Sequence, residues 1–328
     1  MQIRHTAEIC SLVSVSVTCL LAGFCVAASN GDTADSVLFR KSVSEVVLHI
    51  GVLDKKRHTT PMLKAHNIAI FENGSRITHF QSFAREDQLP LRLAILVDNS
   101  GSTSRVWQQE QASTSVFLRS LLRTGDVGFV AEFTDTPTVV QDWTSDANAI
   151  QTGVMNVRGE FFGKTAIADT LIWASAKFAE QPSTSPTRNV LLIVTDGQET
   201  DSVHPMKDAI AAADRADVLV FAIGVGSTYD CNKWDYQAEK PICEDGAERT
   251  LMKDLGQRTG GSTYFVDSKK PFASISKKLA SELRSFYRVS YTPSNVNDTT
   301  YRKLTVQVRG MRHVAIHARD GYSTAALR

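Results

Sequence analysis

The sequence predicts an α/β fold with a doubly wound, mostly parallel sheet. Two short apolar runs lead directly into aspartates, at residues 93–98 and 191–196. Runs of this length suit strands that helices cover on both faces. Strand-like and helix-like segments also alternate through the middle of the chain, which is typical of a doubly wound sheet. Open α/β sheets bind ligands at the carboxyl ends of their strands, so the two aspartates mark a candidate site.

The elements of this sheet follow in a regular order. We expect strands at 93–98, 126–133, 137–143, 191–196, 218–225 and 262–266. We expect helices at 105–122, 146–154, 165–180, 205–215, 247–259 and 271–285. Only the short turn 134–136 separates two of the strands, which predicts a hairpin and therefore one antiparallel edge strand.

Strand-like alternation also occurs on both sides of the sheet domain. It covers 45–53, 67–72 and 76–83 before the domain, and 286–291, 303–309 and 314–319 after it. Neither flank has enough strands to bury a core alone, so we expect one small β-sandwich built from both. The predicted divisions are a signal peptide (1–28), a linker (29–44), the first half of the sandwich (45–89), the α/β domain (90–285), the second half of the sandwich (286–322) and a tail (323–328).

Composition limits the classes of function. The chain has 328 residues, 42% of them hydrophobic, with Lys+Arg 36 against Asp+Glu 35. This composition is typical of globular proteins, and the length suits two domains or one domain with a smaller companion. Without a basic excess, nothing in the charge favours nucleic acid as a partner.

The N-terminus predicts export. A modest positive start at Arg4 and His5 precedes a mostly apolar run at 9–26, and small residues follow at 27–29. This pattern is that of a secretory signal cleaved near Ala28, which predicts a periplasmic or extracellular protein without a stable membrane span. One alternative is an uncleaved membrane anchor, which the serines and threonines inside the apolar run make less favourable. The other is lipidation at Cys25, but the lipoprotein-like pattern there has one residue too many before the cysteine.

Cysteine usage predicts one disulfide. After signal cleavage the remaining cysteines are Cys231 and Cys243, and two cysteines in an exported chain suggest a bridge. They bracket a polar insertion at 232–242, directly after the predicted strand 218–225. The bridge would brace a loop that emerges on the same edge of the sheet as the two aspartates.

Three separate segments supply oxygen ligands at this edge. Asp98-x-Ser100-x-Ser102 places a carboxylate and two hydroxyls in one tight loop, Asp196 adds a carboxylate, and Thr165 adds a hydroxyl at a predicted helix start. An oxygen-only set without His or Cys favours a hard cation, Mg²⁺ or Mn²⁺. The alternative for the loop alone is an ordinary turn, since Asp, Ser and Gly are common turn residues.

The order D-x-S-x-S (98–102), G-K-T-A (163–166) and T-D-G (195–197) resembles the metal-ion-dependent adhesion site of von Willebrand factor type A domains, over about residues 91–286. The resemblance implies an ion with one open position, which a Glu or Asp of a partner protein fills. The implied ligands are Asp98, Ser100, Ser102, Thr165 and Asp196. The flanking strands, with F-E-N-G (71–74) and A-R-D-G-Y (318–322), resemble the related proteins that certain bacteria export.

The leading functional hypothesis is an exported adhesion or binding module whose ion recruits an acidic group of a protein partner. A hydrolase or phosphotransferase is the rival, with Asp98 as nucleophile or Asp196 as base. The segment after Asp98 lacks a second acidic residue, and no His or Lys is clearly placed for proton transfer, so we do not expect an enzyme. A third hypothesis is a structural envelope module whose site stiffens the edge loops.

Overall fold

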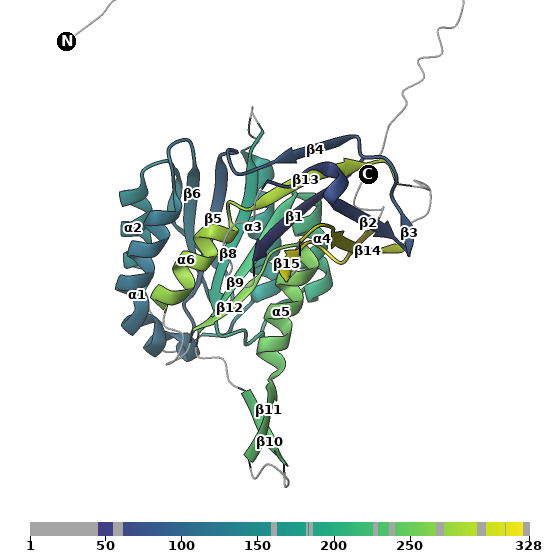
Figure 1. The fold of residues 1–328 in the computed structure, drawn as a ribbon. Coiled ribbons are helices and arrows are strands. Elements are labelled where there is room, and N and C mark those ends of the chain that lie inside the picture. The colour runs from purple at the N-terminus through teal and green to yellow at the C-terminus, as the bar shows by residue number, and fades with distance from the viewer. Residues whose placement is uncertain are drawn as a thin grey trace, which may run out of the picture. The chain divides into compact units, whose positions relative to one another are not determined.

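The computed structural model is built around a mostly parallel sheet with the strand order β12-β9-β8-β5-β6-β7 and helices on both faces (Figure 1). Its strands are β5 (Leu91–Asp98), β6 (Val127–Phe133), β7 (Pro137–Thr144), β8 (Arg188–Thr195), β9 (Val218–Val225) and β12 (Thr263–Val266). All neighbours pair in parallel except β6 and β7, which are antiparallel. The predicted fold class is confirmed, including the antiparallel edge strand.

The structure describes residues 45–54, 62–158, 163–181, 183, 186–225, 229–235, 240–266, 272–293, 300–311 and 313–323. The predicted signal peptide, linker and all but the first residue of the predicted tail lie outside these ranges. The described residues belong to the compact unit formed by residues 43–328. No helix within the described ranges has the length and apolar character that a membrane span needs.

The alternation of side chains along the central strands explains the two helical layers. Every residue of β5 is buried, and successive side chains point to opposite faces of the sheet. Leu93 and Ile95 belong to one apolar cluster, whereas Ala94 and Leu96 belong to the other. Helices must therefore cover both faces to keep this strand out of water.

Each face has its own set of helices. The cluster that contains Leu93 also takes residues from α1 (Gly101–Leu121), α2 (Ala147–Asn156) and α6 (Phe272–Glu282). The cluster that contains Ala94 takes residues from α3 (Ile167–Glu180), α4 (Met206–Arg215) and α5 (Ala247–Thr259). The predicted starts of α1 and α3 were wrong by a few residues, because α1 begins directly after Ser100 and α3 begins two residues after Thr165.

The two flanks combine in a pair of antiparallel sheets, as predicted. One has the order β15-β1-β13-β4 and the other β16-β14-β2-β3. The strands are β1 (Val46–Asp54), β2 (Ile68–Glu72), β3 (Ser75–Arg76), β4 (Ser82–Arg85), β13 (Phe286–Tyr291), β14 (Tyr301–Val308), β15 (Val314–His317) and β16 (Gly321–Ser323), with a 3-10 turn (Ala65–Asn67) before β2. A shared apolar cluster joins both sheets, with Leu48 and Val289 from one and Ile70 and Leu304 from the other.

One predicted strand of the flank was wrong. Within 76–83, only Arg76 lies in β3, which pairs with β2, and only residues 82–83 lie in β4, which pairs with β13 in the other sheet. Residues 77–81 belong to neither strand. The chain therefore changes sheets within a segment whose alternation suggested one continuous strand. The short β16 was not predicted.

The insertion after β9 forms a hairpin of β10 (Tyr229–Asp235) and β11 (Lys240–Asp245), which extends away from the central sheet in Figure 1. The register shifts between the pairs Asp230–Glu244 and Lys233–Ile242. Cys231 and Cys243 lie on these adjacent strands, beside the irregularity. The bridge between them stays a prediction.

Buried charges join the ends of the α/β segment at the amino-terminal edge of the sheet. The Leu91 N–H at the start of β5 donates to Asp126 Oδ1 at 2.7 Å, and Asp126 also pairs with Arg284, just after α6. Arg188, at the start of β8, donates to the Leu283 carbonyl. The chain thus enters and leaves the sheet at neighbouring points, on the edge opposite the two strand-end aspartates.

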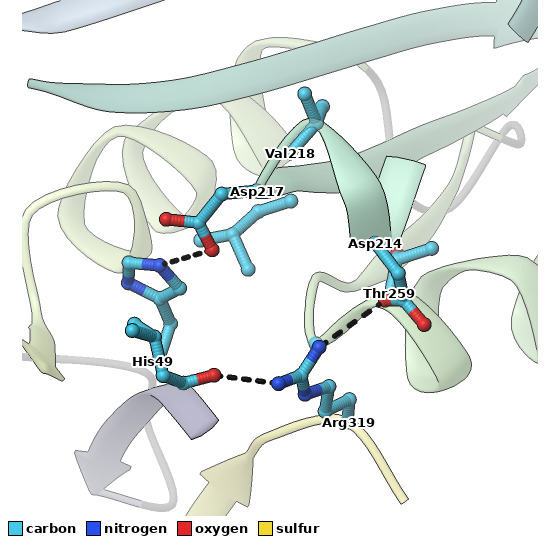
Figure 2. Close-up of a pocket in the computed structure, with 9 residues that line it drawn as sticks. His49, Asp214, Asp217, Val218, Thr259 and Arg319 are labelled. Atoms are coloured by element: carbon cyan, nitrogen blue, oxygen red, sulfur yellow. Dashed lines mark hydrogen bonds and ion pairs between the residues drawn. The ribbon is translucent and has the colours of Figure 1, made fainter. Parts of the chain in front are cut away.

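A second set of charges joins the sandwich to the turn between α4 and β9 (Figure 2). His49 of β1 lies between Glu86 and Asp217, with ring nitrogens 2.8 Å and 3.1 Å from their carboxylates. Arg319 lies 3.5 Å from Asp214. His49, Asp214, Asp217 and Arg319 line a cavity of about 10 Å³, which is about the space that one water molecule needs.

Candidate metal centre

The strand-end aspartates meet at the carboxyl edge of the central sheet. β5 and β8 are parallel neighbours, with Val97 opposite Val194. The next residues, Asp98 and Thr195, therefore emerge side by side, and the Thr195 hydroxyl donates to Asp98 Oδ2 at 2.6 Å. Asp196 follows directly, so one edge of the sheet carries both carboxylates.

The loop after β5 folds back over Asp98. The Ser100 N–H donates to Asp98 Oδ1 at 2.9 Å, and the Ser100 and Ser102 hydroxyl oxygens lie 3.1 Å apart. The Thr103 hydroxyl donates to the Asp98 carbonyl at 2.9 Å. Ser100 has extended backbone dihedrals and precedes the first residue of α1. The turn therefore gathers all three candidate ligands of the first motif.

The spacing of the two hydroxyls fits a small octahedral cation. With Mg²⁺–oxygen distances of about 2.1 Å, neighbouring ligand oxygens of an octahedron lie about 3 Å apart. The Ser100 and Ser102 oxygens are hydrogen-bonded at 3.1 Å, a distance that also matches this spacing. Asp98, Ser100 and Asp196 are buried, whereas Ser102 is exposed, so the candidate centre reaches the surface on the serine side.

The donor set is one of hydroxyls and carboxylates. Within the described ranges, no three side chains of the His, Cys, Asp and Glu types gather into a metal-holding group. A cation at this edge would depend on the hydroxyl oxygens together with the two aspartates. Such oxygen donors suit the hard cations Mg²⁺ and Mn²⁺.

Thr165 is tied to the loop that carries Asp196. Its N–H donates to Thr200 Oγ1 at 2.8 Å, and its carbonyl accepts from the N–H groups of Thr200 and Asp201. Thr165 is buried. The structure thus brings together Asp98, Ser100 and Ser102 in one loop, and connects Thr165 to the neighbouring Asp196 loop.

The electrostatics of the pair of aspartates favour a cation. Burial raises the pKa of Asp98 to about 6, against the opposing effect of hydrogen bonds from Ser100 and Thr195. The negative charge of Asp196 raises that pKa further. A positive ion would relieve the repulsion between the two carboxylates, because it interacts favourably with both.

Sequence reasoning missed several residues around the site. Thr195 and Thr103 hold the side chain and main chain of Asp98, and Thr200 holds Thr165. The position of Thr195 directly before Asp196 was a usable signal, since it puts a hydroxyl beside the strand-end aspartates. The role of Thr200 depends on a contact between residues 35 positions apart, which no local pattern reveals.

Comparison with known proteins gives a family and structural similarities. The von Willebrand factor type A domain model matches residues 93–273. BatB from Bacteroides thetaiotaomicron is 17% identical, with 59% of this chain and 97% of that chain covered and a TM-score of 0.44. A von Willebrand factor type A protein from Catenulispora acidiphila is 12% identical, with coverages of 86% and 75% and a TM-score of 0.44.

Proximal thread matrix protein 1 from the mussel byssus, in a structure described as having a zinc-occupied MIDAS motif, is 16% identical. The match covers 64% of this chain and 49% of the mussel protein's chain, with a TM-score of 0.46. No curated protein matches the chain.

Proposed function

The chain belongs to the von Willebrand factor type A domain family, whose model matches more than half of it, and we propose that it is an exported, metal-dependent protein-binding module. Its Mg²⁺ or Mn²⁺ ion recruits a Glu or Asp side chain of a partner protein. Domains of this family commonly bind protein partners.

The convergence of hydroxyls and carboxylates at one sheet edge carries this proposal. We assign the ion to Asp98, Ser100, Ser102, Thr165 and Asp196. The serine oxygens are 3.1 Å apart, a hydrogen-bond distance that is also compatible with neighbouring ligands of an octahedral cation. The bound ion would supply positive charge at the surface, where it attracts a carboxylate.

The residues around the ligands would keep them in place. Thr195 fixes one carboxylate oxygen of Asp98, and the Ser100 N–H fixes the other. The Gln198 N–H donates to Asp196 Oδ1 at 3.0 Å. Because these hydrogen bonds already orient both carboxylates, little further ordering of them is needed on binding.

Export is proposed from the N-terminal sequence. The basic start, the apolar run at 9–26 and the small residues at 27–29 support a signal peptide cleaved near Ala28. The partner would then be a protein of the periplasm, the envelope or the extracellular space.

The experiment is a capture of envelope and secreted proteins on the immobilised mature chain, with Mg²⁺ in one arm and EDTA in the other. We expect a partner that is retained with Mg²⁺ and lost with EDTA, and that the Asp98→Ala variant does not retain. A partner that the variant and the EDTA arm hold equally well would contradict an ion-mediated contact.

A further inference from the structure

Thr165 lies just before the hydrogen-bonded ladder of α3, which starts with the bond from the Thr170 N–H to the Ala166 carbonyl at 3.1 Å. α3 begins only at Ile167, and its N-cap residue Ala166 makes no side-chain capping bond. Fixing the conformation of such a segment costs backbone entropy. Contacts from elsewhere in the chain must therefore hold Thr165 in place.

Thr200 supplies the main contacts. The Thr165 N–H donates to Thr200 Oγ1 at 2.8 Å, while the Thr200 N–H donates to the Thr165 carbonyl at 2.9 Å. The Asp201 N–H reaches the same carbonyl at 3.2 Å. Both main-chain polar groups of Thr165 are thus bonded to one short segment, which fixes the orientation of its peptide units.

Glu199 supplies the cap that Ala166 lacks. Its Oε2 accepts from the Ala168 N–H at 2.9 Å, and this donor in the first turn of α3 has no acceptor within the helix. A negative charge at a helix N-terminus is also favourable. Ser202 holds the carboxylate through its N–H at 3.0 Å and its hydroxyl at 2.9 Å.

A side chain of α3 also accepts hydrogen bonds from the segment that follows Thr200. Asp169, in the first turn of α3, accepts from the Val203 N–H at 2.8 Å and lies 2.7 Å from His204 Nδ1. Residues 199–204, which we call the clasp, therefore hold the start of α3 at several points. The clasp begins three residues after Asp196, so it links two candidate ligands from different segments.

We propose that Thr200 is a positioning residue of the metal centre, assisted by Glu199. It holds Thr165 so that the Thr165 hydroxyl is presented to the ion together with Asp196. This inference rests on the proposed function, because it assigns a role around the same ion. Its consequence is that ion affinity depends on the Thr200 hydroxyl, although that hydroxyl is bonded to the main chain of Thr165.

The test is titration calorimetry of the full chain with Mn²⁺. Thr200→Ala removes the acceptor for the Thr165 N–H, and we expect affinity about tenfold weaker, as for the loss of one well-placed hydrogen bond. Thr200→Ser retains the hydroxyl and should bind within about twofold of the unmodified chain. Thr305→Ala is the matched control, because Thr305 is exposed on β14.

Melting in EDTA separates positioning from a purely structural role. If Thr200→Ala melts at a lower temperature in EDTA but binds Mn²⁺ unchanged, or if Thr200→Ser is as weak as the alanine variant, the inference is wrong. Should Thr200→Ala not fold, Glu199→Gln serves in its place, and unchanged Mn²⁺ affinity there overturns the inference. Absence of Mn²⁺ binding by the unmodified chain overturns the proposed function as well.

Discussion

Replacing His49 by glutamine should remove a pH-dependent part of the stability. His49 is 7% exposed, and one of its ring nitrogens faces the carboxylate of Asp217 (Figure 2). The other ring nitrogen faces the carboxylate of Glu86. Burial alone would lower its pKa, but the two carboxylates outweigh burial and raise the pKa from 6.5 to about 9. Glu86 also lies 3.7 Å from Arg188.

The sign follows from the direction of the shift. Because the folded-state pKa lies above the unfolded value of 6.5, the stabilisation is fully present below pH 6.5 and is lost as the pH rises through about 9. The full shift corresponds to about 3 kcal/mol. Asp217 is half exposed, and solvent screens its charge. As the pH rises from below 6.5 to above about 9, we therefore expect the unmodified chain to lose about 2 to 3 kcal/mol more unfolding free energy than the variant loses.

The assay is urea unfolding of the unmodified chain and His49→Gln across this pH window. The difference in unfolding free energy between them should be largest below pH 6.5 and shrink above about pH 9. His66→Gln, at an exposed histidine, is the control and should follow the unmodified chain. Parallel profiles for the unmodified chain and His49→Gln would refute the reasoning.

Three further predictions concern the framework. Asp126→Ala should lower the free energy of unfolding, measured in urea titrations, by about 3–5 kcal/mol, because it removes the carboxylate that pairs with the buried Arg284. A loss below about 1 kcal/mol would contradict this prediction, because it is the size expected of a surface pair. We propose a Cys231–Cys243 bridge worth roughly 2–3 kcal/mol, and alkylation without reductant followed by intact-mass analysis should find no free thiol in the oxidised mature chain. Deleting 286–328 removes β13 from between β1 and β4, so hydrogen exchange in 45–85 should become fast; unchanged protection would show that the flanks fold separately.

Patterns of apolar residues predicted the central sheet well. β9 matches its predicted range because it is a continuous buried run of eight residues, and such runs are easily distinguished from their polar borders. The helix starts were less accurate, since Ser100 and Ala166 have conformations that depend on the site loops. The division of 76–83 between two sheets could not be predicted, because alternation does not specify the partner strand.

The candidate site was predicted as a set of ligand positions, without the bonds that arrange them. Asp98, Ser100 and Ser102 are close in sequence, and the structure places them in one turn. The support from Thr195 to Asp98 spans 97 positions, and that from Glu199 to Ala168 spans 31. These contacts depend on strand order and on the path of the loops, which local composition does not determine.

The most direct test of the account is titration calorimetry of the mature chain with Mg²⁺ and Mn²⁺, beside Asp98→Ala. We predict one ion per unmodified chain and none bound by the variant. Urea unfolding in EDTA should show that the variant remains folded, because the apolar clusters on both faces of the sheet do not include Asp98. Equal affinity of the two chains for both ions would contradict the assignment of the metal centre to this edge of the sheet.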